Sequence, residues 1–557
     1  MKNWYFSFFV IVGLIALLTA CGGGESSSNN VENASGKEKK AEEQVLRLAS
    51  SSEIPTMDSG AAVDATSSNA MGAAFSGLMR LDEEENPVPD MAAEDPEISD
   101  DLKIWTFKIR EDVEWSDGSP VTANDFEYAW KRAINPNKES SQYSFLFEAV
   151  GIKNANEILD SNSEIYGEID ELGVKAIDEK TLEVEFDYPQ PFFKSILWFG
   201  PFLPLKEDFV ENEGEEYAQE ADKILYNGPY KMSEWNQGES WTWEKNEDYW
   251  DASSYHLEKV EFRVVKDLST QVKLYEQGEI DQTDLKGEEM ITKFQDNPEF
   301  EEGLEASTMS IRIGQRDSTL KNKKIRKALY NGINREGLTD ILLNDGSVPA
   351  HYIVPKEFVE GPDGDDFRDK YPEINKVSME EAIDLWKEGK KEENIDEITY
   401  TLYLSDKDED DTIASYIQAE LEDNFEGLSI EVVKQPWKAF LQSYLNEEYD
   451  LSYIGFSPDY NDPVTFLDIF TTGHQQNTMG IDLEEYNDII ADAKRMTDEP
   501  EKRWESLQEA EKLLLEESSD IPLFQKGHSW IQKPYVKDMR FPVYGVNMDW
   551  YKAYIVE

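Results

Sequence analysis

The side chains that most often carry catalysis or hold metal ions are few in this sequence and lie far apart. Its four histidines are His256, His351, His474 and His528, and none has a spacing typical of metal ligands. The sequence contains one cysteine, Cys21, and no Gly-x-Ser-x-Gly elbow, phosphate-binding loop or Gly-x-Gly-x-x-Gly turn. We therefore expect no enzyme centre, metal site or cofactor. Paired carboxylates for glycoside hydrolysis remain open, because any pair can be found among 117 acidic residues.

One acidic run imitates the start of a calcium-binding loop. Asp406, Asp408 and Asp410 have the alternating spacing of the first ligands in such a loop. However, Asp411 occupies the position where the sharp turn requires glycine, and Ile417 occupies the position of the bidentate acid. We interpret the run as solvated charge.

The N-terminal segment has the pattern of a secretion signal. An apolar stretch from Trp4 to Leu18 is too short and too poorly flanked for a membrane-spanning helix, and it ends in small residues. The motif Leu18-Thr19-Ala20-Cys21 resembles the lipobox of bacterial lipoproteins. This resemblance implies that residues 1–20 are a signal peptide, and that Cys21 carries a lipid anchoring the protein to the outer face of the cell membrane. An uncleaved membrane anchor is the alternative, but it leaves the cysteine and its glycines unexplained.

Residues 21–43 consist almost entirely of Gly, Ser, Asn, Glu and Lys. Such a composition offers too little apolar surface to compensate for the entropy of ordering. We expect a disordered tether that holds the folded part off the membrane.

The charge of the chain excludes one class of partner. It has 117 acidic and 54 basic residues, and its formal net charge is −63. A surface this anionic repels phosphate, so nucleic acid is excluded as a general partner. Acidic surfaces keep proteins hydrated and dispersed in strong salt, where screening reduces their self-repulsion. We therefore predict a halophilic protein, from a source that meets high salt.

Strand and helix patterns alternate along the chain. Trp105, Phe107 and Ile109 alternate with polar neighbours, which predicts a half-buried strand, and Leu182, Val184 and Phe186 predict another. Thr122 with Asp125 forms a capping-box variant before apolar residues at helical spacing. Further helices are predicted by the same rules at three places: after Ser378 with a stop at Gly389, before Gly278, and from 486 to 517 with a break near Pro500. The fold class is α/β.

Several motifs resemble those of the extracellular oligopeptide-binding proteins that serve ABC importers, and they occur in the order of that family. The most specific is the run from Trp115 to Phe126, Trp-Ser-Asp-Gly-Ser-Pro-Val-Thr-Ala-Asn-Asp-Phe. The others are Phe75-Ser76-Gly77-Leu78, Asn227-Gly228-Pro229-Tyr230, Tyr249-Trp250-Asp251, Gly278-Glu279-Ile280-Asp281 and Asp459-Tyr460-Asn461-Asp462-Pro463. We interpret most of these motifs as turns and caps that do not contact ligand.

The resemblance implies a periplasmic-binding-protein fold of type II, with two hinged lobes and an extra inserted domain. Domain I would combine residues 44–74, 200–304 and 533–557. Domain II would be inserted as residues 75–199, and domain III would span residues 305–532. Such a protein binds a peptide between the lobes and delivers it to the permease and ATPase of an ABC transporter. We expect it to act as a monomer.

The resemblance also implies the residues of the binding site. Asp459 would neutralise the α-ammonium group of the peptide, because an enclosed cation needs a counter-charge. The backbone of Gly455, Phe456 and Ser457 would form one edge for the peptide, and Val63, Asp64 and Ala65 would form the other. Trp437 and Tyr143 would line side-chain pockets.

Alternatives remain at each level. Asp459 could instead cap the turn before Pro463, and Trp437 could belong to the core. Tyr444 and Tyr453 stand where some family members have basic residues, so a fixed clamp for the peptide carboxylate is doubtful. The same fold could bind a nickel chelate, an opine or an oligosaccharide. A secreted hydrolase is the alternative from another class, and the lack of a catalytic signature argues against it.

The acidic composition makes a testable prediction about stability. We expect the melting temperature of the folded part to rise as NaCl increases from low to molar concentration, because salt screens the repulsion between carboxylates. Differential scanning calorimetry over a salt series measures this. A melting temperature that stays constant or falls would contradict the halophilic interpretation.

Overall fold

The protein is represented by a computed structural model that describes residues 39–62, 64–138, 141–190, 192–315, 319–406, 408–458, 460–474, 476–496 and 499–557. The signal segment, Cys21, most of the tether, Val63 and Asp459 lie outside the described residues. Of the helices within the described ranges, none combines the length and the apolar character that a membrane span requires.

A four-stranded sheet joins two distant parts of the chain. Its order is β1 (Val45–Ser50), β10 (Lys259–Val264), β9 (Ser240–Lys245) and β8 (Tyr230–Asn236), with β1 parallel to β10 and the other pairs antiparallel. Leu46, Leu48, Trp241 and Trp243 alternate with more exposed residues and are buried. The helix α1 (Ala65–Ala74) packs on this sheet through β8.

A second sheet is formed within residues 75–199. Its order is β4 (Glu97–Ile98), β5 (Ile104–Lys108), β7 (Thr181–Glu185) and β6 (Val174–Asp178), and α2 (Ala123–Ile134) packs against it. The two strands predicted from alternation are therefore confirmed. The predicted capping box is also confirmed, because the Asp125 carboxylate accepts the backbone N–H of Thr122 at 2.7 Å.

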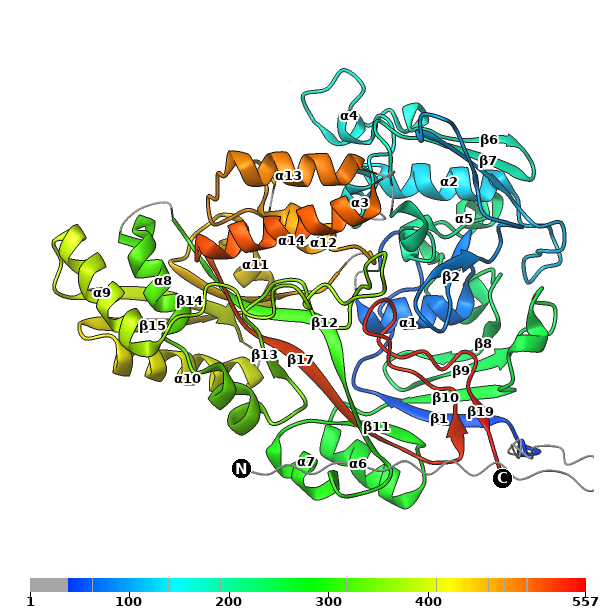
Figure 1. Ribbon diagram of the computed structural model, residues 1–557. Helices are drawn as coiled ribbons and strands as arrows, with labels where there is room; N and C mark the ends of the chain where they lie inside the picture. The colour runs from blue at the N-terminus through cyan, green and yellow to red at the C-terminus, as the bar shows by residue number, and fades with distance from the viewer. Residues whose placement is uncertain are drawn as a thin grey trace, which may run out of the picture. The chain divides into compact units, whose positions relative to one another are not determined.

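The largest sheet runs through the middle of the molecule (Figure 1). Its order is β11 (Gln282–Leu285), β17 (Asp520–Gln532), β12 (Phe300–Ile313), β16 (Leu451–Phe456), β14 (Ile398–Ser405) and β15 (Leu428–Gln435), and β13 (Val348–Pro349) also pairs with β17. β12 and β17 are long and antiparallel, with register shifts near Thr308 and Ser310. β14 is parallel to both β15 and β16. Parallel and antiparallel strands combined with helices confirm the α/β class.

The remaining elements are short hairpins and covering helices. The bounds of the strands are β2 (Met79–Leu81), β3 (Pro87–Pro89), β18 (Val536–Lys537) and β19 (Tyr554–Ile555). The bounds of the helices are α3 (Phe145–Ala149), α4 (Ala155–Leu159), α5 (Glu207–Glu213), α6 (Leu268–Gln277), α7 (Glu288–Phe294), α8 (Lys323–Asn331), α9 (Met379–Glu393), α10 (Asp408–Asn424), α11 (Trp437–Leu445), α12 (Val464–Leu467), α13 (Glu484–Arg495) and α14 (Pro500–Glu516).

The apolar core has two parts. One extends through all three sheets, and a smaller cluster lies beneath α6 and α7, where it includes Val272, Tyr275, Ile291 and Ile531. The predicted end of α6 is confirmed, since Gly278 adopts φ +73° at its C-cap. The predicted break near Pro500 is confirmed as well, because α13 and α14 are separate helices and α14 begins at that proline.

Two local predictions are wrong. Gly389 does not end α9, which continues to Glu393 and is capped by Asn394 at φ 56°. Gly389 instead lies where α9 meets the start of α8, and a Cβ there would come within 2.6 Å of Ile325 Cγ1. Asp410 is not solvated charge, because it is only 9% exposed and accepts a hydrogen bond from the Ser405 hydroxyl. It lies in the first turn of α10, next to the end of β14.

The close contact at Gly389 predicts the effect of a substitution. Glycine to alanine in a helix interior normally stabilises the helix, but Gly389→Ala should lower stability by about 1–3 kcal/mol because the new methyl group overpacks the contact with α8. Urea denaturation followed by circular dichroism measures the change. The exposed neighbour Lys387→Ala is the control, with an expected change within about 0.5 kcal/mol. A stabilised Gly389→Ala protein would contradict the packing role.

Candidate binding site

Three parallel strands of the central sheet have their carboxyl ends on the same side of that sheet. β14, β15 and β16 run in the same direction, and Ser405 is in register with Gln435. The segments that follow these strands therefore emerge together. They begin with Asp406, Pro436 and Ser457. In open α/β sheets, ligands bind beyond the carboxyl ends of the strands.

β16 keeps part of its backbone unpaired on one side. Towards β12 it is paired along its whole length, from Leu451 with Ile313 to Phe456 with Thr308. Towards β14 its ladder covers only Leu451 and Ser452. Within the described residues, Ile454–Phe456 therefore has no ladder partner on the β14 side. Gly455 also lies close to β12, because a Cβ there would come within 2.3 Å of Met309 Sδ. The end of β16 thus offers a strand edge to an extended ligand.

Trp437 follows β15 at the carboxyl end of the parallel strands. It is the first residue of α11, its side chain is 52% exposed, and its ring lies 5.6 Å from that of Phe440. Trp437 therefore presents part of its ring to solvent at the carboxyl end of β15. By contrast, Tyr444 and Tyr453 are buried. The Tyr444 hydroxyl receives a hydrogen bond from Arg312, and its ring stacks on Tyr449 at 5.6 Å, so it belongs to the core.

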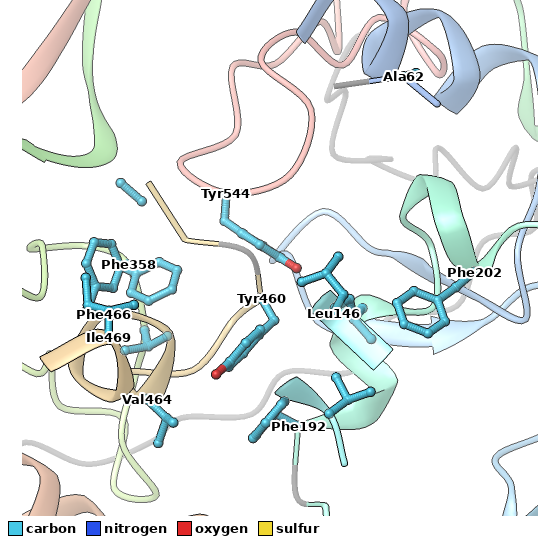
Figure 2. Close-up of a cluster of buried hydrophobic side chains, with 14 of the residues drawn as sticks. Ala62, Leu146, Phe192, Phe202, Phe358, Tyr460, Val464, Phe466, Ile469 and Tyr544 are labelled. Atoms are coloured by element: carbon cyan, nitrogen blue, oxygen red, sulfur yellow. The ribbon is translucent and has the colours of Figure 1, made fainter. Parts of the chain in front are cut away.

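A continuous row of aromatic rings connects the end of β16 with Tyr143. Neighbouring ring centroids lie 5.0–6.2 Å apart along the whole row. Its members in order are Tyr143, Phe199, Trp198, Tyr544, Phe358, Phe466 and Phe456. In Figure 2, Tyr544 lies between Phe358 and Phe466 on one side and Leu146 on the other. The row links two of the predicted site residues, Tyr143 and Phe456, through the five rings that lie between them.

The C-terminal loop joins this row to α1. The backbone N–H of Asn547 donates to Asn69 Oδ1 at 3.0 Å, and the Tyr551 hydroxyl donates to Asn69 O at 2.8 Å. Asp64 is the N-cap of α1 and accepts the backbone N–H of Ser67 at 2.9 Å, and Ala65 is the first residue of that helix. The predicted second edge is therefore a helix start at Asp64 and Ala65, so these two residues do not supply a β-strand.

Each of the three residues after Asp459 has a partner elsewhere in the fold. Tyr460 stacks on Phe192, with ring centroids 4.2 Å apart and planes inclined by 5° (Figure 2). Asn461 Nδ2 donates to Glu85 O at 3.5 Å. Asp462 forms a two-bond ion pair with Arg503, with both N–O distances 2.8 Å. The chain that leaves β16 is thus anchored immediately beyond Asp459.

A cavity of about 110 Å³ lies under the C-terminal loop, lined by Arg80, Glu85, Asp90 and Tyr544 among others. Burial raises the pKa of Asp90, although Arg80 and hydrogen bonds from Tyr249 and Trp250 oppose the rise. Burial also raises the pKa of Glu85, against hydrogen bonds from backbone N–H groups of the loop. Both carboxylates are therefore engaged by groups of the protein itself.

Sequence reasoning did not find Trp198, Phe358 or Tyr544. They come from three separate parts of the chain and meet only in the fold. The local signal was weak, because aromatic residues in irregular segments are common in any core. In the described part of the chain, no three His, Cys, Asp or Glu side chains are arranged to hold a metal ion.

Comparison with known proteins agrees with this architecture. The family profile described as "Bacterial extracellular solute-binding proteins, family 5 Middle" matches residues 86–478. The dipeptide-binding protein DppE of Bacillus subtilis is 32% identical over 521 residues, which cover 93% of this chain and 94% of that protein.

Solved structures show the same similarity. The substrate-binding domain of an oligopeptide ABC transporter from Bacillus anthracis has a TM-score of 0.78 and 38% identity, covering 93% of this chain and all of that one. Listeria monocytogenes OppA bound to peptide has a TM-score of 0.77 and 36% identity over the same shares. These comparisons confirm the periplasmic-binding-protein fold. The chain belongs to the family 5 bacterial extracellular solute-binding proteins.

Proposed function

We propose that this protein captures peptides outside the cell and delivers them to the permease and ATPase of an ABC importer. The observation that carries the proposal is the edge of β16 at Ile454–Phe456, which has no ladder partner towards β14 among the described residues. An exposed tryptophan follows β15 at the same end of the sheet. A peptide can add its backbone to such an edge, and main-chain hydrogen bonds are common to every sequence. Relatives named dipeptide-binding and oligopeptide-binding proteins support the same ligand class.

Asp459 is the residue we assign to the α-ammonium group of the peptide. It follows the end of β16 directly in the sequence, so its position in the chain matches the unpaired strand edge. Trp437, Phe456 and Tyr143 supply apolar surface for side chains. The α-ammonium group loses its hydration when the lobes close, and a preplaced carboxylate compensates for that loss.

Lobe closure around β12 and β17 completes the proposed mechanism. β12 carries the chain from residues 200–304 into 305–532, and β17 leads from there into 533–557. The pairing of these two strands has register shifts near the end of β16. Bulges and shifts are places where a strand bends. We assign residues 44–74, 200–304 and 533–557 to one lobe, 75–199 to an inserted domain and 305–532 to the opposing lobe. The protein releases its ligand intact and does not hydrolyse it.

A binding experiment tests the proposal. Isothermal titration with mixed tripeptides to pentapeptides should give saturable binding, and mass spectrometry should recover the peptides unchanged. Asp459→Ala should weaken binding by at least about 2 kcal/mol, because the buried ammonium loses its counter-charge. The control is Asp170→Ala, since the Asp170 side chain is 90% exposed and forms a surface ion pair with Lys131. Unchanged isotherms for Asp459→Ala would remove this residue from the site, and peptide cleavage would refute the binding function.

We also propose that Cys21 carries the lipid that anchors the protein. In a bacterial host that processes lipoproteins, the wild-type protein should partition with membranes and incorporate labelled fatty acid. Cys21→Ala should be recovered from the medium without label, because it lacks the thiol that receives the lipid. Membrane retention of that variant would contradict lipid anchoring.

A further inference from the structure

The stack of Phe192 on Tyr460 joins two parts of the chain that are far apart in sequence. Phe192 belongs to the loop that follows β7, and Tyr460 lies four residues beyond the end of β16. Both side chains are 4% exposed, and their rings are nearly parallel at a centroid distance of 4.2 Å. The contact is therefore a buried junction between residues 75–199 and 305–532.

Neighbouring contacts divide the segment after Asp459 between these two parts. Asn461 donates to a backbone carbonyl of the β2–β3 turn, which belongs to residues 75–199. Asp462 instead pairs with Arg503 of α14, within residues 305–532. Tyr460 and Asn461 therefore face the inserted segment, whereas Asp462 holds the chain to its own part of the molecule. Tyr460 and Asn461 thus each have a contact with the inserted segment.

The same loop makes a second contact through Tyr188. Tyr188 lines a surface cavity of about 290 Å³ together with Asp468 and Lys494. The Lys494 ammonium pairs with Asp468 at 2.8 Å. Burial by itself would lower the pKa of Lys494, but the nearby Asp468 raises it above its ordinary value. This contact thus places Tyr188 beside an ion pair of residues 305–532.

Gln190 lies between Tyr188 and Phe192 in the sequence, and it destabilises the junction. It is 1% exposed, and within the described residues neither Nε2 nor Oε1 has a hydrogen-bond partner. A buried amide without partners is unfavourable relative to the same amide in water. The loop from Tyr188 to Phe192 therefore combines a favourable ring stack with an unfavourable buried amide. The fraction of molecules with the stack formed is therefore sensitive to substitutions in this loop.

We propose that Phe192 is a positioning residue for the ligand anchor: its stack on Tyr460 holds the chain next to Asp459 in the ligand-binding arrangement. This inference rests on the proposed function, since it assumes that Asp459 neutralises the peptide ammonium. In this arrangement the inserted segment acts on the ligand anchor through the Phe192–Tyr460 stack. The apparent affinity then scales with the fraction of molecules whose stack is formed.

The test compares two leucine variants and two peptides. Phe192→Leu removes the stack but keeps apolar volume. The matched control is Phe262→Leu, which removes a stack with Trp241 (4.8 Å, 13°) in the first sheet. Each protein is titrated with one peptide that has a free α-amino group and with its N-acetylated form. Loss of a ring stack should weaken binding of the free peptide by about fivefold or more.

The N-acetylated peptide separates positioning from general loss of structure. It has no ammonium group, so its affinity should change by less than about twofold in Phe192→Leu. Phe262→Leu should leave both affinities unchanged. Equal weakening for both peptides, or no weakening in Phe192→Leu, would overturn the proposal. In the double variant with Asp459→Ala, Phe192→Leu should add no further loss, because both substitutions remove the same interaction. An additive loss would also overturn it.

Gln190→Leu should change the affinity in the opposite direction to Phe192→Leu. Removing the unpartnered amide should strengthen the junction and tighten binding of the free peptide by about threefold or more. Unchanged or weaker binding by Gln190→Leu would contradict the unfavourable contribution that is assigned to the buried amide.

If the wild-type protein binds no peptide, the proposed function fails, but hydrogen exchange still reports on the junction. Amides of residues 460–467 should exchange faster in Phe192→Leu and not in Phe262→Leu, and equal rates would refute the positioning role.

Discussion

Backbone pairing along β12 is the interaction on which the rest of the structure depends. This strand bonds to β17 on one side and to β16 on the other, so it connects the two large parts of the chain through main-chain hydrogen bonds. Because β16 is fully paired towards β12 and only briefly paired towards β14, its free edge always points the same way. The direction in which this edge faces is therefore a consequence of strand order and not of any single side chain.

Electrostatics is organised differently at the surface and in the interior. The chain carries a large excess of acidic residues, yet several of its few basic residues are buried. Arg335 donates to the carbonyl groups of Ala350, Pro522 and Tyr330 at 2.7–3.0 Å and thereby joins three segments. Arg503 uses both ends of its guanidinium to hold Asp462 beside the binding site. A planar guanidinium is suited to such junctions, because it has several donors in a fixed geometry.

Local features could be predicted from sequence because their causes are local. The capping box at Thr122 and Asp125 and the glycine cap of α6 depend on residues within one turn. Gly389 shows where this reasoning ends: glycine is typical of helix ends, but here it allows α9 to approach α8 at Ile325. That neighbour is more than sixty positions away in the sequence, so no local pattern distinguishes the two roles. The partner of Asp410, Ser405, is only five positions away, but the burial of Asp410 depends on how the start of α10 packs beside the end of β14.

For the binding site, the amino-acid sequence alone determined the fold class, the family and the short motif around Asp459, because these depend on residue order and on periodicity. Only the tertiary structure decided that Tyr143 and Phe456 belong to one aromatic row through Trp198, Tyr544 and Phe358. It also decided that Phe192 lies on Tyr460, a contact across more than 250 residues. Ring contacts of this kind depend on how the sheets pack against one another, and side-chain packing between distant segments leaves no periodic trace in the sequence.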